Sequence, residues 1–479
     1  MASTALWIAD HQANIKTSQL IHRTIINLPL KNYRNIVCAN ALRLDWNEVL
    51  PAEKCSYIMG NPPFVGYSNH SPGQKEDRAA IFGQAGGVLD YVACWYKKSA
   101  DYIADFPIYC ALVSTNSITQ GQQVTPLWKP LTDSGIGIDF AHRSFLWSSE
   151  GTGQALVYVV IIGFSHSDTR QKLIFTGNDV QKVDHINAYL ANAQDTFVER
   201  RVKPLCAVPE MVAGGKPTDG GFLILNPKEK TQLLSAHPEL EPWVKRFSMG
   251  EEFINGKDRY CLWFVGITPQ ELQAFPQIVL DRINGVRAMR LASTKEATRK
   301  KADTPWLFDE VRPPDTLTYI GVPKVSSERR RYIPLGFVSN GMIPGDKLYF
   351  VPTDSLYYFG ILMSQVHNAW MRVVTGRLKS DYRYSNTIVY NNFMWPNPTD
   401  VQKTKIEMLA QAVLDAREKY PNATLAQMYD PDKDYLFPEL TKAHKELDKA
   451  VEEAYGVKFN GNEEKIVAHL FKLYADATS

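Results

Sequence analysis

The chain has 479 residues, of which 44% are hydrophobic and 22% charged, and its formal net charge is +2. This composition is ordinary for a globular protein, and the length predicts about two to four domains. The sequence has no basic-then-apolar leader and no apolar run long enough to span a bilayer, and its six cysteines show no paired spacing. We therefore expect a cytoplasmic protein that is neither secreted nor integral to a membrane, without a disulfide framework or a metal site.

The first predicted element is a helix over Ala5 to Gln19, because apolar residues recur on one of its sides. A short buried strand is expected at Asn35 to Ala39, and Asn40-Ala41-Leu42 follows it. A second strand starts at Ser56 and runs into Asn61-Pro62-Pro63-Phe64. Two successive prolines lack N–H groups and cannot stay in a central ladder, so this strand must end there.

The tetrapeptide Asn61 to Phe64 has the chemistry of a binding site for an amine. The carboxamide oxygen of Asn61 and the carbonyl of Pro62 are acceptors, and Phe64 offers an apolar ring. In an open α/β sheet, ligands bind at the carboxyl ends of the strands, which is where this tetrapeptide is expected. Together these groups suit a planar ring with an exocyclic amine. A Pro-Pro turn that only ends a strand is the alternative interpretation.

Later segments of the first 200 residues continue the pattern. A helix is predicted from Gly87 to Ile103, followed by a buried strand at Ile108 to Val113 and a long strand at Ala155 to Phe164. Repeated strand, polar end and helix predict a parallel doubly wound sheet, so the expected fold class is α/β. We assign residues 1–200 to a first domain on this basis.

The composition changes beyond residue 200. A loop-rich link at Pro209 to Gly221 precedes short strand and helix signals, which predict a mixed α/β domain over residues 210–398. From Arg282 to Arg331, twelve Lys and Arg oppose six Asp and Glu. This excess favours contact with phosphates, and a solvated helix face is the alternative for each cluster. The clusters are Arg282, Arg287, Arg290, Arg299, Lys300 and Lys301 in a helical segment, and Arg329, Arg330 and Arg331 beyond it.

A sharper candidate for nucleic-acid contact is the segment from Gly376 to Thr387. It interleaves Arg, Lys and Tyr with small hydrogen-bonding residues, which can serve phosphates and base edges together. A loop of charged residues without a ligand is the alternative. The side chains predicted to contact double-stranded DNA are Lys216, Arg329, Arg330, Arg331, Arg377, Lys379, Tyr382 and Arg383.

The final segment, residues 400–479, is predicted to be helical. Its helices are expected over Lys405 to Lys419, Pro438 to Tyr455 and Glu463 to Asp476. We expect a packing or clamp role for this segment and a structural role for His444.

The tetrapeptide resembles the (Asp/Asn/Ser)-Pro-Pro-(Phe/Tyr) motif of amino-group methyltransferases, in the form typical of DNA N6-adenine enzymes. In that family the two acceptors bind the N6 amine of a flipped-out adenine, the aromatic ring stacks on it, and the methyl of S-adenosylmethionine (SAM) transfers in line. The resemblance implies three sets of site residues. They are Asn61, Pro62, Pro63 and Phe64 for catalysis, Asn40, Leu42 and Asn61 for the cofactor, and Phe64, Phe145 and Trp147 for stacking on the flipped base.

Stretches along nearly the entire chain resemble the MmeI-like enzymes, which are single-chain type II restriction-modification proteins. The resemblance implies a partial SAM-dependent methyltransferase domain with a Rossmann-like sheet, a DNA target-recognition domain over residues 210–398, and a helical carboxyl-terminal segment. The matching stretches are Ala5 to Gln12, Gly60 to Gly66, Gly87 to Val92, Lys216 to Gly221, Arg259 to Trp263, Arg377 to Ser380 and Leu440 to His444.

One part of the family pattern is not found. In the family, a loop resembling Phe-x-Gly-x-Gly and an acid for the ribose hydroxyls come before the helix that begins here at Ala5. We therefore expect weak SAM binding by this chain and a partner polypeptide that supplies the missing amino-terminal half, with its nuclease and cofactor loop. Pro314-Asp315 is not followed by acid-x-Lys, so we expect no DNA cleavage by this chain.

Three functions remain open. Asn61 to Phe64 favours a site-specific adenine-N6 DNA methyltransferase of a restriction-modification system. The absent Gly-rich loop favours a catalytically inactive DNA-binding specificity module. Methylation of a protein glutamine uses a similar motif, but the basic downstream domain argues against it.

Overall fold

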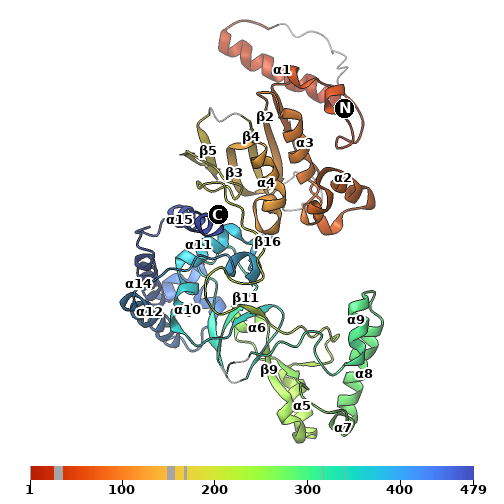
Figure 1. Cartoon of the computed structure of the whole chain (residues 1–479), viewed down its shortest axis with the longest axis vertical. Helices are drawn as coiled ribbons and strands as arrows, with labels where there is room; N and C mark the ends of the chain where they lie inside the picture. Colours follow the sequence, from red (N-terminus) through yellow and green to blue (C-terminus); the bar gives the residue numbers. More distant parts are fainter. Residues whose placement is uncertain are drawn as a thin grey trace. The chain divides into compact units, whose positions relative to one another are not determined.

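The computed structural model describes residues 2–25, 36–147, 157–166, 170–314, 316, 318–339 and 341–479 (Figure 1). The chain divides into two compact units. The first unit comprises residues 1–118, 126–146 and 159–184, and the second comprises residues 119–125, 147–158 and 185–479. Among the described residues, no helix is both long and apolar enough to cross a membrane.

The first unit is built on a six-stranded sheet in the order β1-β2-β4-β3-β5-β6. β1 pairs in parallel with β2, whereas β2 and β4 are antiparallel, as are β5 and β6. The α/β class is confirmed, but the expectation of an all-parallel sheet is wrong. A strand buried on both faces has the same apolar sequence in either direction, so its residues do not reveal its orientation. The strands are β1 (Tyr57–Gly60), β2 (Tyr109–Thr115), β3 (Gly137–Trp147), β4 (Val157–Ser165), β5 (Lys172–Thr176) and β6 (Asp179–Val183).

The helices in this part of the chain begin with α1, which matches the helix predicted from Ala5. They are α1 (Ala2–Ile21), α2 (Pro72–Phe82), α3 (Ala93–Ile103) and α4 (Val124–Asp133). α3 packs against β2, because the buried hydroxyl of Tyr96 donates to the Leu112 carbonyl at 3.3 Å and lies 2.9 Å from Ser114 Oγ. The strand expected at Asn35 to Ala39 does not form over its described residues 36–39, where Ile36 and Val37 are exposed and have no ladder partner.

The second unit contains three small sheets, in the orders β14-β9-β10-β8, β13-β11-β15-β7 and β12-β17-β16. Alternating short strands and helices in this unit agree with the mixed α/β expectation. The strands are β7 (Val212–Ala213), β8 (Ile224–Leu225), β9 (Val244–Ser248), β10 (Tyr260–Leu262), β11 (Tyr319–Pro323), β12 (Val325–Ser326), β13 (Gly336–Val338), β14 (Ile343–Pro344), β15 (Leu348–Val351), β16 (Gly376–Leu378) and β17 (Asp381–Arg383).

Helices of the second unit pack both on these sheets and on one another. α10, α12 and α14 lie side by side (Figure 1), and Gly360 lets α10 approach Ile406 and Ala410 of α12 closely. The helices are α5 (Pro227–Ala236), α6 (Gly250–Asn255), α7 (Pro269–Gln273), α8 (Gln277–Leu291), α9 (Glu296–Lys300), α10 (Leu356–Met363), α11 (Gln365–Val374), α12 (Asp400–Glu418), α13 (Leu425–Met428), α14 (Pro438–Ala454) and α15 (Glu463–Thr478).

Candidate active site and nucleic-acid interface

The candidate active site lies at the carboxyl edge of the first sheet. β1 ends at Gly60, so Asn61 leaves the ladder where the prolines predict. Because β1 and β2 are parallel, Asn61 and Asn116, the residue after β2, lie at the same edge. Asn116 Nδ2 donates to Ser144 Oγ at 2.9 Å, which brings the residue before Phe145 to this edge as well. Three strand ends therefore contribute polar or aromatic groups.

Within the tetrapeptide, the side chain of Asn61 is exposed to solvent and that of Pro62 is buried. Asn61 is exposed, and its carboxamide has no hydrogen-bond partner within the described part of the chain. Pro62 is buried, and Phe64 is half-buried. The Asn61 carboxamide is therefore available to a ligand while the prolines restrict its backbone.

The loop after the tetrapeptide is held by the carbonyl of Val65. Tyr91 N–H donates to this carbonyl at 2.9 Å, and His70 Nε2 lies 3.1 Å from it. Arg78 Nη1 lies 3.1 Å from His70 Nδ1, and a guanidinium only donates, so Nδ1 is the acceptor. The imidazole is then neutral with its proton on Nε2, which donates to Val65. Burial lowers the pKa of His70 below its ordinary value and favours the same state.

Asn40 and Leu42, the predicted cofactor residues, have local partners. Leu42 N–H donates to Asn40 Oδ1 at 3.0 Å, and Asn40 Nδ2 donates to Asp77 Oδ2 at 3.0 Å. The Leu42 side chain is buried against Tyr91 and Cys94. Asn40 itself is exposed, and contact of these two residues with a cofactor stays a prediction.

Sequence reasoning missed Asp77, a buried acid of α2. It receives hydrogen bonds of 2.6 Å from the Tyr91 hydroxyl and 2.6 Å from Arg43 Nε, besides the one from Asn40. Burial opposes ionisation of Asp77, but these hydrogen bonds outweigh it and lower the pKa of the carboxyl. Tyr91 thus links the Asn40 loop, through Asp77, to the Val65 carbonyl that follows the tetrapeptide.

The two residues predicted to stack on a flipped base lie on β3. Phe145 is half-buried, and its ring centroid is 4.5 Å from that of His142. Trp147 is the last residue of the strand, is 38% exposed and is assigned to the second unit. Their stacking role stays a prediction.

Most cationic residues predicted to contact DNA are exposed, but several have protein partners. Lys216 Nζ lies 3.7 Å from Asp309, Arg329 pairs with Asp432, and Arg331 Nη2 donates to Gln365 at 2.8 Å. Arg330 is half-buried. The exposed residues of this predicted set are Lys216, Arg329, Arg331, Lys379 and Arg383.

Two residues of the predicted DNA-binding set, Arg377 and Tyr382, pair with each other across the β16–β17 hairpin. Arg377 Nη1 donates to Glu328 at 3.1 Å and to the Ser380 carbonyl at 2.9 Å, and its guanidinium lies 4.4 Å from the centroid of the Tyr382 ring. Tyr382 is only 6% exposed. These two side chains pack against each other within the hairpin, and their contact with DNA stays a prediction. The hairpin exposes Lys379, at a left-handed φ of 58°, together with Arg383.

The interpretation of the basic helix as a row of phosphate contacts is wrong for Arg290. This side chain is fully buried. It uses its N–H groups on five backbone carbonyls, at distances of 2.8 to 3.2 Å. The five acceptors belong to Pro217, Thr218, Lys301, Thr304 and Leu307. Positive charge in the sequence did not distinguish this buried clamp from a solvated cation.

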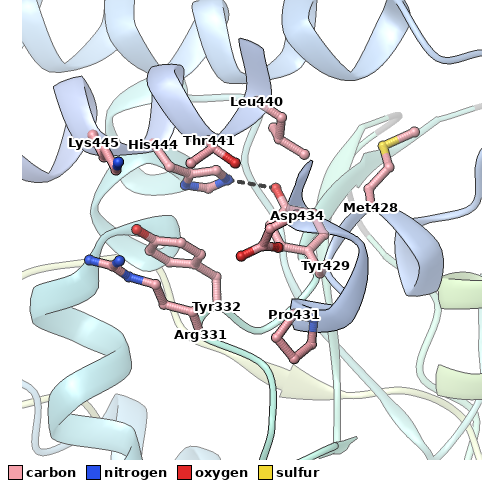
Figure 2. A pocket seen from close by; sticks show the side chains of 10 residues that line it. All are labelled: Arg331, Tyr332, Met428, Tyr429, Pro431, Asp434, Leu440, Thr441, His444 and Lys445. Carbon is pink, nitrogen blue, oxygen red and sulfur yellow. Dashed lines mark hydrogen bonds between the residues drawn. The ribbon is translucent and has the colours of Figure 1, made fainter. Parts of the chain in front are cut away.

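Arg331 also borders a small pocket between the loop before β13 and the carboxyl-terminal helices (Figure 2). The ring of Tyr332 stacks on His444 with centroids 4.2 Å apart. Tyr429 receives hydrogen bonds from Arg417, so its own hydrogen is donated to His444 Nε2 at 2.7 Å. His444 is buried, in keeping with the structural role expected for it. Among the described residues, no group of His, Cys, Asp or Glu is placed to hold a metal ion, and Asp315 lies outside them.

The sheet and its strand-end tetrapeptide define a methyltransferase-type α/β domain, followed by a mixed α/β domain and a helical segment. Family models match all three parts: the MmeI DNA-methyltransferase domain over residues 1–176, the MmeI target recognition domain over residues 192–397 and the MmeI C-terminal domain over residues 398–479. The chain belongs to the MmeI family.

Two known proteins are similar over the whole chain. DNA methyltransferase A of Bacillus subtilis (strain 168) is 39% identical over 486 residues, which cover 100% of this chain and 54% of that protein. A solved structure of the Type IIL restriction-modification enzyme MmeI in complex with DNA is 44% identical with a TM-score of 0.88, and the match covers 99% of this chain and 64% of that one. The chain therefore spans only about half to two thirds of the length of these relatives.

Proposed function

We propose that this chain carries out the methyl-transfer and target-recognition steps of a site-specific DNA adenine-N6 methyltransferase in a restriction-modification system. The observation that carries the proposal is the exposed Asn61 carboxamide, which has no partner within the described residues and lies at the carboxyl edge of the sheet. Relatives named a DNA methyltransferase and a restriction-modification enzyme in complex with DNA support it. The substrate is double-stranded DNA. We place the reaction in the cytoplasm, because its reducing conditions keep cysteines as free thiols, and all six cysteines are free.

The residues at this edge suit the amine of a flipped adenine. The Asn61 carboxamide oxygen and the Pro62 carbonyl accept hydrogen bonds from the two N6 hydrogens. These two bonds fix the orientation of the amine, so its nitrogen lone pair faces the methyl group. Phe64 and Phe145 supply rings against the base. SAM, when bound, supplies the electrophilic methyl group, and no covalent intermediate with the protein is needed.

The chain fits part of a SAM site. Exposed Asn40 and Asn61 belong to two loops that the Asp77 and Tyr91 contacts tie together, and they are the groups we propose for the cofactor. The sequence before Gly60 contains no glycine, so it offers no Gly-rich turn for close approach of a nucleotide. We propose that another polypeptide completes the site.

The open edge of β1 is the proposed docking place for that polypeptide. β1 pairs only with β2 among the described strands, and Tyr57 and Met59 are 66% and 85% exposed. Beside it lies a hollow of about 510 Å³ on the sheet face. Mainly apolar residues of five strands line it, together with Asp139 and Gln171, and Arg170 borders it over the ring of Tyr109. A strand added to β1 pairs its free backbone groups, and apolar side chains from the same polypeptide cover the hollow.

The substitution Asn61→Ala tests the catalytic proposal. With the amino-terminal part of a longer relative supplied, we expect methyl transfer from labelled SAM to DNA to fall by about a hundredfold or more, because a positioned hydrogen bond is lost. DNA binding should be unchanged. Substantial N6-methyladenine formation by this variant would contradict the mechanism.

A catalytically inactive specificity module is the alternative to a methyltransferase. The two candidates differ in one measurement. A module of that kind binds DNA but forms no N6-methyladenine even when the amino-terminal part is supplied, whereas a methyltransferase does.

A further inference from the structure

Asp90 is a buried acid just before α3, and it is only 7% exposed. Its two carboxylate oxygens have different partners. Tyr67 N–H donates to Oδ1 at 2.9 Å, and the Ser117 hydroxyl donates to Oδ2 at 2.5 Å. Thr115 Oγ1 lies 2.8 Å from Ser117 Oγ, and because the Ser117 hydrogen points to Asp90, Thr115 is the donor of that bond. A short chain of hydrogen bonds thus runs from the end of β2 to the loop after the tetrapeptide.

Asp90 lies two residues before the N-cap of α3, which is Val92. Its backbone carbonyl accepts from Ala93 N–H at 3.1 Å in the first turn of the helix. Its carboxylate accepts from Tyr67 and Ser117, which lie in two different loops. The carboxylate therefore joins these loops to the start of α3.

Asp90 and Tyr91 together hold the loop at two consecutive points. The Asp90 carboxylate accepts from Tyr67 N–H, while Tyr91 N–H donates to the Val65 carbonyl at 2.9 Å. One residue supplies an acceptor and the next a donor, so the backbone from Val65 to Tyr67 is fixed in both position and direction. Phe64 directly precedes this clamped stretch.

We propose that Asp90 is a positioning residue for methyl transfer. It fixes the loop carrying Asn61 and Phe64 to the end of β2 through Ser117, so that the carboxamide and the ring keep their places when a base arrives. The proposal rests on the function proposed above. Losing a charge-assisted hydrogen bond of this kind changes an equilibrium by about tenfold or more.

Hydrogen exchange of the full chain tests the clamp without any need for activity. In Asp90→Ala, peptides covering residues 61–70 should exchange about tenfold faster or more, because Tyr67 N–H loses its acceptor. Asp90→Asn should stay close to the wild type, since its oxygen accepts from Tyr67 and its amide donates to Ser117 Oγ. The matched control is Asp101→Ala, an exposed acid of α3 paired with Lys97. Unchanged exchange in Asp90→Ala, or equal acceleration across α3 and β2, would overturn the proposal.

Kinetics separate positioning from general stability. With the amino-terminal part of a longer relative supplied, Asp90→Ala should lower kcat by about ten- to a hundredfold and leave KM for DNA within about twofold, and Asp90→Asn should restore most of kcat. A raised KM with unchanged kcat would refute the positioning role. If the wild type forms no N6-methyladenine at all, the proposed function fails, and the exchange experiment still decides whether Asp90 clamps the loop.

Discussion

The hydroxyl of Tyr332 donates a hydrogen bond of 2.7 Å to Asp448 Oδ2, which joins the segment before β13 to α14. The other oxygen of the same carboxylate accepts from Gln365 N–H at 2.7 Å, at the start of α11. Burial raises the pKa of Asp448 to about 6, despite these two donors. Two histidines, His367 and His444, are also buried in the helical core of the second unit, together with Asp448.

The stability of the second unit should fall as the pH is lowered below about 6.5. Burial lowers the pKa of His367 to about 3 and that of His444 well below its ordinary value, so the folded state excludes their protons. Each histidine then removes about 1.4 kcal/mol of folding free energy per pH unit below pH 6.5. Asp448 acts oppositely, because its raised pKa adds stability as the pH falls from about 6 to about 4. The destabilisation from the two histidines is larger than the stabilisation from Asp448, so the net free energy of unfolding falls as the pH is lowered.

Urea unfolding at pH 7.5, 6.5 and 5.0 measures this balance. His444→Gln keeps an acceptor for the Tyr429 hydroxyl but has no titrating group. Its free energy of unfolding should therefore vary less between pH 6.5 and pH 5.0 than that of the wild type, by about 1.4 kcal/mol per pH unit. Equal pH dependence of the two proteins would show that His444 is not neutral in the folded state.

Replacing Arg290 should destabilise the second unit. Arg290→Met leaves five buried carbonyls without their donor, and we expect a loss of at least about 3 kcal/mol in the free energy of unfolding. Arg287→Met is the matched control, because Arg287 is an exposed arginine of the same helix. A similar small effect of both substitutions would contradict the clamp.

DNA affinity should depend steeply on salt, and the exposed residues of the β16–β17 hairpin should contribute to that dependence. Lys379→Ala and Arg383→Ala should each reduce the slope of log affinity against log salt by about one. Arg377→Ala should mainly affect stability, since its guanidinium is occupied by Glu328 and Ser380. Fluorescence anisotropy over a salt series measures these slopes. Lys442→Ala, at an exposed position of α14, serves as the control, and a slope equal to the wild type in both hairpin variants would exclude this surface.

The open edge of β1 should make the isolated chain self-associate. Met59→Lys places a charge on that edge and should shift the chain towards monomer in sedimentation velocity experiments. Val202→Lys is a matched control, because Met59 and Val202 are both 85% exposed.

The isolated chain should also bind SAM poorly. Calorimetry of the purified chain should find no saturable SAM binding in the micromolar range. Tight binding without a partner would mean that the chain forms the cofactor site from other residues.

Local signals in the sequence predicted the elements that local physics determines. α14 and α15 begin at the predicted residues, Pro438 and Glu463, and β1 ends before the two prolines. The direction of β4 was not predictable, because strand orientation is set by the chain's path and not by the residues of the strand.

The contacts that position the candidate site depended on distant residues. Asp90 lies inside an apolar run, which is a weak sign of a buried acid with partners, but nothing nearby indicates that these partners are Tyr67 and Ser117. In the same way, charge alone did not separate buried Arg290 from exposed Lys379. The catalytic, cofactor and stacking roles of the individual residues stay predictions.

The Arg290 clamp also sets a limit on how freely the second unit can diverge. Every residue has a backbone carbonyl, so a guanidinium that binds five carbonyls is indifferent to the side chains at those positions. Residues around the clamp can therefore be exchanged while their backbone stays in place. For anyone redesigning the surface of this unit, position 290 is one to keep and the side chains around it are ones to vary.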